Sequence, residues 1–159
     1  YGPGMETCEL RRDLQRSRDP VHVRLMRHRR LLQMTISDRP EGESWWWFCR
    51  FGQMESMRIA LHSRETGELV AAGQLGGMDL FIPKWGVRSV GLRKILVPEP
   101  LRRFGYAQFL VLELCRRLRE EHVQLVEAQV GVENSAALEL FTSSKFELHG
   151  RLQTFRKRF

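Results

Sequence analysis

The feature that most constrains the fold is a change of hydrophobic period close to residue 100. Residues 87–97 are rich in Val, Leu and Ile and end at a proline, which predicts a strand. From Tyr106 to Glu121 the apolar positions instead recur every three to four residues, the pattern of an amphipathic helix. A strand that leads directly into an amphipathic helix indicates a sheet covered by helices, and therefore an α/β fold.

Periodic segments on both sides of this junction complete the sheet. Residues 57–62 and 69–74 alternate on either side of a turn, so they predict a β-hairpin. Farther along, residues 123–130 predict a strand, 134–144 a second, shorter helix, and 146–158 two final strands bent near Gly150. This order of three strands, helix, strand, helix and two strands implies an α/β sheet of mixed direction.

The first 36 residues are basic and differ in character from the rest. Residues 6–18 are mostly polar and predict a short helix, whereas alternation over residues 21–25 predicts a strand. The polar stretch 38–44 predicts a loop. We therefore expect a basic N-terminal segment over residues 1–36 and a main domain over 37–159. The first residue is Tyr1 rather than Met, which indicates a fragment or a trimmed chain.

Composition narrows the class of protein. Lys and Arg number 26 against 19 Asp and Glu, a net charge of +7, which permits an anionic partner such as a phosphorylated cofactor or a nucleic acid. No apolar run reaches the ~18 residues of a membrane-spanning helix. Cys8, Cys49 and Cys115 have no paired spacing, which predicts no metal site and a reducing, cytoplasmic compartment. Cys115, inside an apolar helical pattern, and Cys49, after an aromatic run, are predicted to be buried. The aromatic run at 45–48 predicts core packing, with ligand contact as the alternative.

The junction near residue 100 has the chemistry of an anion site. Arg102-x-x-Gly105-x-Ala107 stands where the helix begins, and the first N–H groups of a helix have no intrahelical partner. The helix dipole adds partial positive charge, small residues let a phosphate approach the backbone, and Arg102 and Arg103 add two full charges. A pyrophosphate suits such a loop, although the hexapeptide alone also fits an ordinary turn from strand to helix.

A second motif follows one strand later. Asn134-x-x-Ala137-x-x-Leu140-Phe141 lies on the second predicted helix. With these two motifs in this order of elements, residues 57–158 resemble the GNAT superfamily of N-acetyltransferases. The resemblance implies a mixed, largely antiparallel sheet with a splayed central strand pair and flanking helices.

The resemblance also implies roles for residues of this sequence. In the family, an Arg/Gln-x-x-Gly-x-Gly/Ala loop binds the coenzyme A pyrophosphate through backbone amides, and the strand before it pairs with the pantetheine arm. The next strand, here 123–130, splays away and admits the acyl thioester, and an Asn after it orients the cofactor. The implied cofactor-binding residues are Ile95, Leu96, Val97, Arg102, Arg103, Phe104, Gly105, Tyr106, Ala107, Asn134 and Phe141.

Catalysis depends on two positions. Many family members carry, on the last helix, a Tyr whose hydroxyl protonates the departing thiolate, but Phe141 stands there and has no proton to donate. A base in this family is often a Glu on the splayed strands. Alternation places Glu127 on one face of strand 123–130, so it is either the base or a structural carboxylate paired with Arg93 or Lys94.

The region before the hairpin departs from the family pattern. The family normally places a strand and one or two helices there, whereas only residues 37–52 directly precede the hairpin in this chain. The second copy of a tandem GNAT protein often begins in this way. On that analogy, residues 26–36 resemble the last strand of a preceding copy, and residues 1–19 belong to its closing helix region.

We therefore expect an acyl-CoA-dependent N-acyltransferase, with acetyl-CoA or another acyl-CoA as cofactor and a small-molecule or protein amine as acceptor. Two alternatives remain open. Phe141 and the basic strand at 87–97 also fit a domain that binds acyl-CoA without catalysis, as a sensor or an assembly module. The Arg-rich N-terminal segment also fits a nucleic-acid or ribosome-associated protein, although it lacks the interleaved aromatic residues of single-strand binders.

Overall fold

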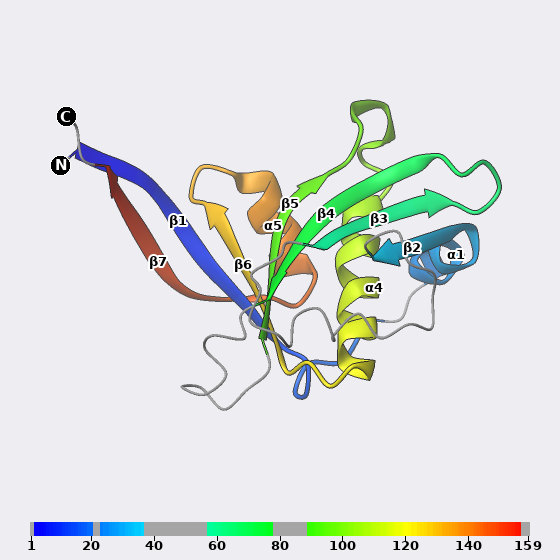
Figure 1. The fold of residues 1–159 in the computed structure, drawn as a ribbon, viewed down its shortest axis with the longest axis horizontal. Helices are drawn as coiled ribbons and strands as arrows, with labels where there is room; N and C mark the ends of the chain where they lie inside the picture. The colour runs from blue at the N-terminus through cyan, green and yellow to red at the C-terminus, as the bar shows by residue number, and fades with distance from the viewer. Residues whose placement is uncertain (1, 21–22, 37–56, 78–88, 157–159) are drawn as a thin grey trace.

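The computed structural model describes residues 2–20, 23–36, 57–77 and 89–156, and their strands form one seven-stranded sheet in the order β2-β3-β4-β5-β6-β1-β7 (Figure 1). The strands and helices are β1 (Gly2–Asp13), α1 (Val23–Leu31), β2 (Leu32–Ile36), β3 (Met57–Ser63), β4 (Leu69–Gly77), β5 (Ser89–Leu96), the 3-10 turn η2 (Glu99–Leu101), α4 (Tyr106–Glu120), β6 (Leu125–Gly131), α5 (Ser135–Ser143) and β7 (Glu147–Arg156). Among the described strands, only β5 and β6 run parallel to each other. The predicted mixed, largely antiparallel α/β fold is confirmed.

The hydrophobic core lies between one face of the sheet and α4. Every second residue of β6, at 126, 128 and 130, is buried on this face, and α4 contributes Leu110, Leu114 and Leu118, which are completely buried. The predicted amphipathic helix and the predicted hairpin of β3 with β4 are therefore confirmed. Cys115 is buried as expected, Cys8 is buried too, and Cys49 lies outside the described residues.

The prediction for the N-terminal segment was wrong. Residues 6–18 do not form a helix but belong to β1 and to the turn that follows it. This strand lies between β6 and β7 and pairs antiparallel with both. Its backbone groups are satisfied by strands that lie far away in the sequence, so local propensity does not reveal it. Together β1 and β7 extend as a ribbon beyond the rest of the sheet, with the start of β1 and the end of β7 paired at its tip (Figure 1).

The prediction for the next element was also wrong. The residues expected to form a strand at 21–25 begin helix α1 at Val23, and residues 21 and 22 lie outside the described part of the chain. Residues 26–36, expected to resemble a final strand, are helical as far as Leu31, and only β2 is extended. β2 pairs with β3, and β1 pairs with β6 and β7, so both strands belong to the sheet of the main domain. They nevertheless precede the expected domain boundary at residue 37.

The last strand shows a smaller difference. We expected two strands bent near Gly150, but β7 is one strand whose pairing with β1 has two register irregularities, between Pro3 and Glu6 and between Glu9 and Leu10 of β1. The expected loop at 38–44 and the aromatic run at 45–48 lie outside the described residues. Within the described ranges, no helix combines the length and hydrophobicity needed to cross a membrane.

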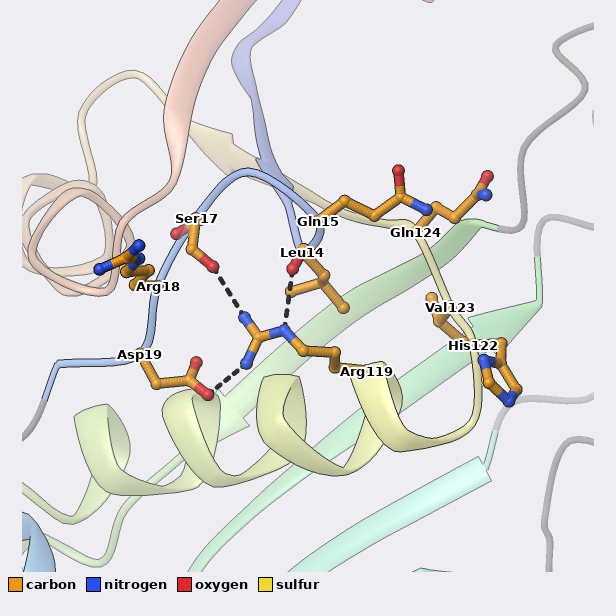
Figure 2. Close-up of a pocket in the computed structure, with 9 residues that line it drawn as sticks. All are labelled: Leu14, Gln15, Ser17, Arg18, Asp19, Arg119, His122, Val123 and Gln124. Carbon is orange, nitrogen blue, oxygen red and sulfur yellow. Dashed lines mark hydrogen bonds and ion pairs between the residues drawn. The ribbon is translucent and has the colours of Figure 1, made fainter.

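A group of arginine contacts holds the end of β1 against α4. Arg12 is buried, and its guanidinium donates to the Asp19 carboxylate at 2.9 Å and to the Ser17 hydroxyl at 3.0 Å. Arg119 of α4 donates to the carbonyls of Leu14 at 2.8 Å and Ser17 at 2.9 Å, and it also pairs with Asp19 (Figure 2). The turn after β1 is therefore fixed to the C-terminal half of the helix.

Candidate functional site

The candidate site begins where β5 and β6 separate. Their parallel pairing ends at Leu92 and Ala128, whereas β5 continues to Leu96 and β6 to Gly131. Past Leu92, β5 remains paired with β4 on its other side. Among the described residues, no strand pairs with the edge of residues 93–96 that would face β6, so this edge is open there and the predicted splay of the two strands is confirmed.

A bulge in β5 accounts for this separation. Arg93 and Leu96 pair with Gln74 and Ala72 of β4, so β5 holds one extra residue between these two pairs. Within the bulge, Lys94 has a φ of 51°, in the left-handed region that non-glycine residues seldom adopt. A bulge bends its strand and increases the local twist, which directs the end of β5 away from β6.

The loop at residues 102–107 closes one end of the opening. Gly105 is the N-cap of α4 with a φ of 77°, and Arg103 has a φ of 71°. Glycine adopts this conformation readily, whereas for Arg103 it costs about 1 kcal/mol or more, so surrounding contacts must hold it. Arg102 donates through Nε to the carbonyl of Val97 at 3.1 Å, which ties the loop to the end of β5.

The first turn of α4 presents backbone N–H groups at this end of the opening. The first bond inside the helix runs from the Phe109 amide to the Gly105 carbonyl at 2.9 Å. The N–H groups of Tyr106, Ala107 and Gln108 precede that bond and have no partner within the helix. Together with the helix dipole, they make this end of the opening suitable for an anion.

These elements surround one cavity of about 640 Å³ between the two splayed strands, the first turn of α4 and helix α5. Ten of the twelve predicted site residues line it: Ile95, Leu96, Val97, Arg102, Arg103, Gly105, Tyr106, Ala107, Asn134 and Phe141. The other lining residues are Leu92, Arg93, Lys94, Leu101, Gln108, Gln129, Val130, Gly131, Ala136, Ala137 and Leu140. The two predicted residues outside the lining are Phe104, whose exposed ring lies beside Tyr106, and Glu127.

The second motif forms the wall of the cavity opposite the loop. Asn134 is the N-cap of α5, and its side-chain oxygen accepts a hydrogen bond from the Ala137 amide at 3.1 Å. This bond fixes the start of the helix beside the cavity. Phe141 is buried and packs edge-on against Phe146, with ring centroids 5.1 Å apart. The cavity wall therefore has an apolar ring at the position where the resemblance implied a hydroxyl.

Glu127 lies beside the cavity, on the face of the sheet opposite the core. Arg11 of β1 forms its ion pair, at 3.5 Å from Nε to Oε2, so the expected pairing with Arg93 or Lys94 is replaced by one with the N-terminal strand. Arg11 also donates to Glu9 at 2.5 Å. Burial and the neighbouring Glu9 carboxylate raise the pKa of Glu127, against the lowering effect of the Arg11 guanidinium.

The polar face of β6 connects Glu127 to the cavity. Gln129 lines the cavity and lies two residues farther along the same face, a separation of about 7 Å along a strand. On β5 the register partner of Glu127 is Gly91, which contributes no side chain beside the carboxylate. A group bound at the cavity beside Gln129 would therefore lie about 7 Å from Glu127, a distance that water molecules could bridge.

Two groups of residues near the site were not indicated by the sequence. Glu9 and Arg11 accompany Glu127 because β1 inserts beside β6. Behind the loop, Arg24 and His28 of α1 contact its backbone. The sequence contains one sign of β1, the alternation of apolar Cys8 and Leu10, both buried, with polar Glu9 and Arg11. This alternation covers too few residues to predict a strand. Within the described ranges, no three His, Cys, Asp or Glu side chains are arranged to hold a metal ion.

Comparison with known proteins places the fold. The model of the acetyltransferase (GNAT) family matches residues 24–146. Three solved structures share the fold. A tandem GNAT protein from the clavulanic acid biosynthesis pathway has 13% sequence identity and a TM-score of 0.57, over 92% of this chain and 51% of that one, and a GCN5-related N-acetyltransferase from Sphaerobacter thermophilus has 14% identity and a TM-score of 0.59, over 95% of this chain and 50% of that one. An aminoglycoside acetyltransferase from an uncultured soil metagenomic sample, in complex with sisomicin, has 10% identity and a TM-score of 0.60, over 82% of this chain and 98% of that one.

These matches extend over different shares of the known proteins. The chain spans about half the length of the first two. No curated protein matches the sequence significantly. At identities of 10% to 14%, the structural likeness establishes the fold.

Proposed function

Because this chain belongs to the GNAT acetyltransferase family, we propose that it is an acyl-CoA-dependent N-acyltransferase that moves an acetyl group from acetyl-CoA to an amine. The main support for this proposal is the cavity between β5 and β6, in which the open edge of β5 leads to the N-terminus of α4. An extended, amide-containing arm that ends in a pyrophosphate matches both of these features.

The cavity residues fit a coenzyme A thioester. The open edge of β5 at residues 93–97 offers backbone N–H and C=O groups to the amides of a pantetheine arm, as an added strand would use them. The free N–H groups at the start of α4, with Arg102 and Arg103, suit the pyrophosphate. Small residues, Gly131 and Ala137, keep the opposite wall clear. Each part of the ligand therefore has a chemically matched part of the cavity.

The proposed reaction needs a proton acceptor and a polarised carbonyl. Bound acetyl-CoA supplies an activated acyl group. The amine nitrogen bonds to the acyl carbon as the carbon–sulfur bond breaks, and the sulfur takes the bonding electron pair. Backbone N–H groups of the β5 edge would polarise the carbonyl oxygen. Glu127 would take the proton of the amine through water molecules beside Gln129.

The environment of Glu127 supports this role. A carboxylate with a raised pKa holds the proton of an amine better than an ordinary surface carboxylate does. The nearby Glu9 adds negative charge that favours a cationic ammonium on this face before its proton is lost. We also propose a reducing, cytoplasmic location, because Cys8 and Cys115 are free thiols in the folded chain.

A second candidate is an acyl-CoA-binding module without catalysis. Phe141 favours it, because the cavity wall there has no proton donor for the departing sulfur. The two candidates share the cofactor site and differ only in turnover. Release of free coenzyme A, followed with a thiol reagent over a broad panel of amines, separates them: amine-dependent release supports the transferase, and none above the rate of hydrolysis supports the module.

Calorimetric titration with acetyl-CoA tests the site itself. We expect binding at micromolar concentration that Gly105→Glu abolishes, because a side chain strains the left-handed N-cap and its Cβ would lie 3.0 Å from the Arg24 guanidinium that packs against the loop. Gly150→Glu is the matched control: it adds the same charge on β7, where a Cβ has open space. No binding by the unsubstituted protein, or equal binding by the two variants, would contradict the proposal.

A further inference from the structure

Helix α1 contacts the loop at residues 102–107 from the side away from the cavity. Arg24 donates through Nη2 to the carbonyl oxygen of Arg103 at 3.2 Å. Nε2 of His28 lies 2.9 Å from the carbonyl oxygen of Phe104. Neither Arg24 nor His28 lines the cavity, whereas Arg103 and Gly105 do. The loop therefore separates the two α1 side chains from the proposed pyrophosphate site.

These two contacts determine the direction of two backbone N–H groups. The peptide bonds of the described residues are trans, and in a trans peptide the C=O of one residue and the N–H of the next point in opposite directions. When Arg24 holds the Arg103 carbonyl toward α1, the N–H of Phe104 points away from α1. When His28 holds the Phe104 carbonyl, the N–H of Gly105 points away as well. Both N–H groups are then directed to the cavity side of the loop.

The loop needs such external support. Arg103 and Gly105 both have left-handed φ angles, of 71° and 77°, and for the arginine this conformation is unfavourable. The Arg24 guanidinium also lies against Gly105: a Cβ atom added to Gly105 would be 3.0 Å from the Cζ atom of Arg24. Relaxation of the loop toward ordinary φ values would rotate these peptide planes and turn their N–H groups from the cavity.

Helix α1 is itself held in place. The His28 ring lies 5.2 Å from the Tyr106 ring and 5.6 Å from the Phe109 ring, measured between centroids. The next residue, Arg29, pairs with the buried Glu113 of α4 at 3.3 Å. The donors of α1 are therefore fixed relative to the first turn of the helix that they support.

We propose that Arg24 and His28 are positioning residues for the cofactor pyrophosphate: they hold two carbonyls outward so that the N–H groups of Phe104 and Gly105 face the ligand. This inference rests on the proposed function, because it assumes that a coenzyme A pyrophosphate occupies the loop. It assigns α1 a part in ligand binding that does not depend on direct contact with the ligand.

The test compares two ligands in a set of variants. Acetyl-CoA carries the pyrophosphate, and S-acetylpantetheine lacks it and binds only along β5. For Arg24→Ala with His28→Ala we expect acetyl-CoA affinity to fall about 10- to 30-fold, the loss of two hydrogen bonds of ordinary strength, and S-acetylpantetheine affinity to change less than twofold. Arg27→Ala, which removes the same charge from an exposed position of α1, controls for long-range electrostatics.

Conservative variants separate positioning from folding. Arg24→Lys and His28→Gln keep a donor at each position, so they should recover most of the acetyl-CoA affinity. Amide exchange of Phe104 and Gly105 in the ligand-free protein should accelerate in the alanine variants and not in the conservative ones. If the alanine variant lost equal affinity for both ligands, or lost no more acetyl-CoA affinity than Arg27→Ala does, the inference would be overturned and the proposed function would remain intact. Failure of the unsubstituted protein to bind acetyl-CoA would overturn both.

Discussion

Asp19→Asn provides a strict test of how β1 is held in the sheet. The Arg12 side chain is completely buried and is paired with Asp19 at 2.9 Å, and Asp19 also pairs with Arg119 of α4. An asparagine keeps the size of the side chain and removes the negative charge. Arg12 then remains buried in the core with no carboxylate beside it among the described residues, and two guanidinium groups face each other across a neutral amide.

The expected loss of stability follows from this geometry. Removal of one partner of a fully buried ion pair costs about 3–5 kcal/mol, because the other charge stays desolvated and unpaired. The side chain of Asp19 is 26% exposed, so water reaches the pair and we reduce this figure to about 2–4 kcal/mol. With a urea dependence of about 2 kcal/mol per molar for a domain of this size, the unfolding midpoint should fall by about 1–2 M.

Equilibrium unfolding in urea at pH 7 measures this shift. Glu120→Gln is the matched control, since it removes a carboxylate that is 67% exposed and paired with Arg116 at 2.7 Å, and such pairs contribute about 0–1 kcal/mol. The reasoning is refuted if Asp19→Asn shifts the midpoint no more than the control does. It is also refuted if the variant unfolds through a separate early transition of β1 while the rest of the domain keeps its midpoint.

The effect should also depend on pH. Burial opposes ionisation of Asp19, but its hydrogen bonds with Arg119 and Arg12 and their charges hold its pKa below the ordinary value of 3.8. A group whose pKa is lower in the folded state contributes stability above its unfolded pKa and loses it as the pH falls through the folded one. The difference between the two proteins should therefore be constant above about pH 5 and shrink below 3.8. A difference that stays unchanged at acid pH would show that another group compensates Arg12.

The remaining predictions concern turnover with whichever amine the panel identifies. Glu127→Gln should lower kcat by about 10²- to 10⁴-fold and remove the acidic limb of the pH profile, because the raised pKa of Glu127 sets the pH at which the base becomes ionised. An unchanged acidic limb would assign the proton to another group. Phe141→Tyr should raise kcat and leave the acetyl-CoA dissociation constant within about threefold, because it adds a proton donor to the cavity wall and keeps the ring. Stopped-flow detection of the released thiol measures kcat for both variants. An unchanged kcat in Phe141→Tyr would show that the departing sulfur does not need a proton donor at this position.

The sequence was most informative where structure is determined locally. The strand at β5, the turn at Gly105 and the helix that follows are adjacent in the chain, and their residue pattern contains most of what decides their conformation. For the same reason Asn134 could be placed correctly at the start of α5. The splay of β5 from β6 followed from the family resemblance, and the bulge at Lys94 that accompanies it leaves no recognisable pattern in the sequence.

The N-terminal elements were missed because distant contacts decide them. In β1, a core position is occupied by Arg12, whose charge is compensated by Asp19 and not by any neighbour along the strand, so hydrophobic alternation stops there. Helix α1 buries only Leu25 among its apolar residues and leaves Val23 82% exposed, so it has almost no amphipathic signal. Its stability comes from contacts with α4, which a local pattern cannot contain.

The two N-terminal elements support the proposed site by different kinds of interaction, and this has a consequence for its chemistry. Helix α1 holds the loop through hydrogen bonds to the carbonyls of Arg103 and Phe104, whereas β1 surrounds Glu127 with the opposite charges of Arg11 and Glu9. Salt weakens interactions between partly buried charges such as Arg11, Glu9 and Glu127 less than between exposed ones, but still more than it weakens hydrogen bonds to a backbone carbonyl. On the proposed function, changes in α1 should therefore alter cofactor affinity, and changes in β1 should alter the pH and salt dependence of turnover. Binding and proton transfer would then be separable within one domain, binding through α1 and proton transfer through β1.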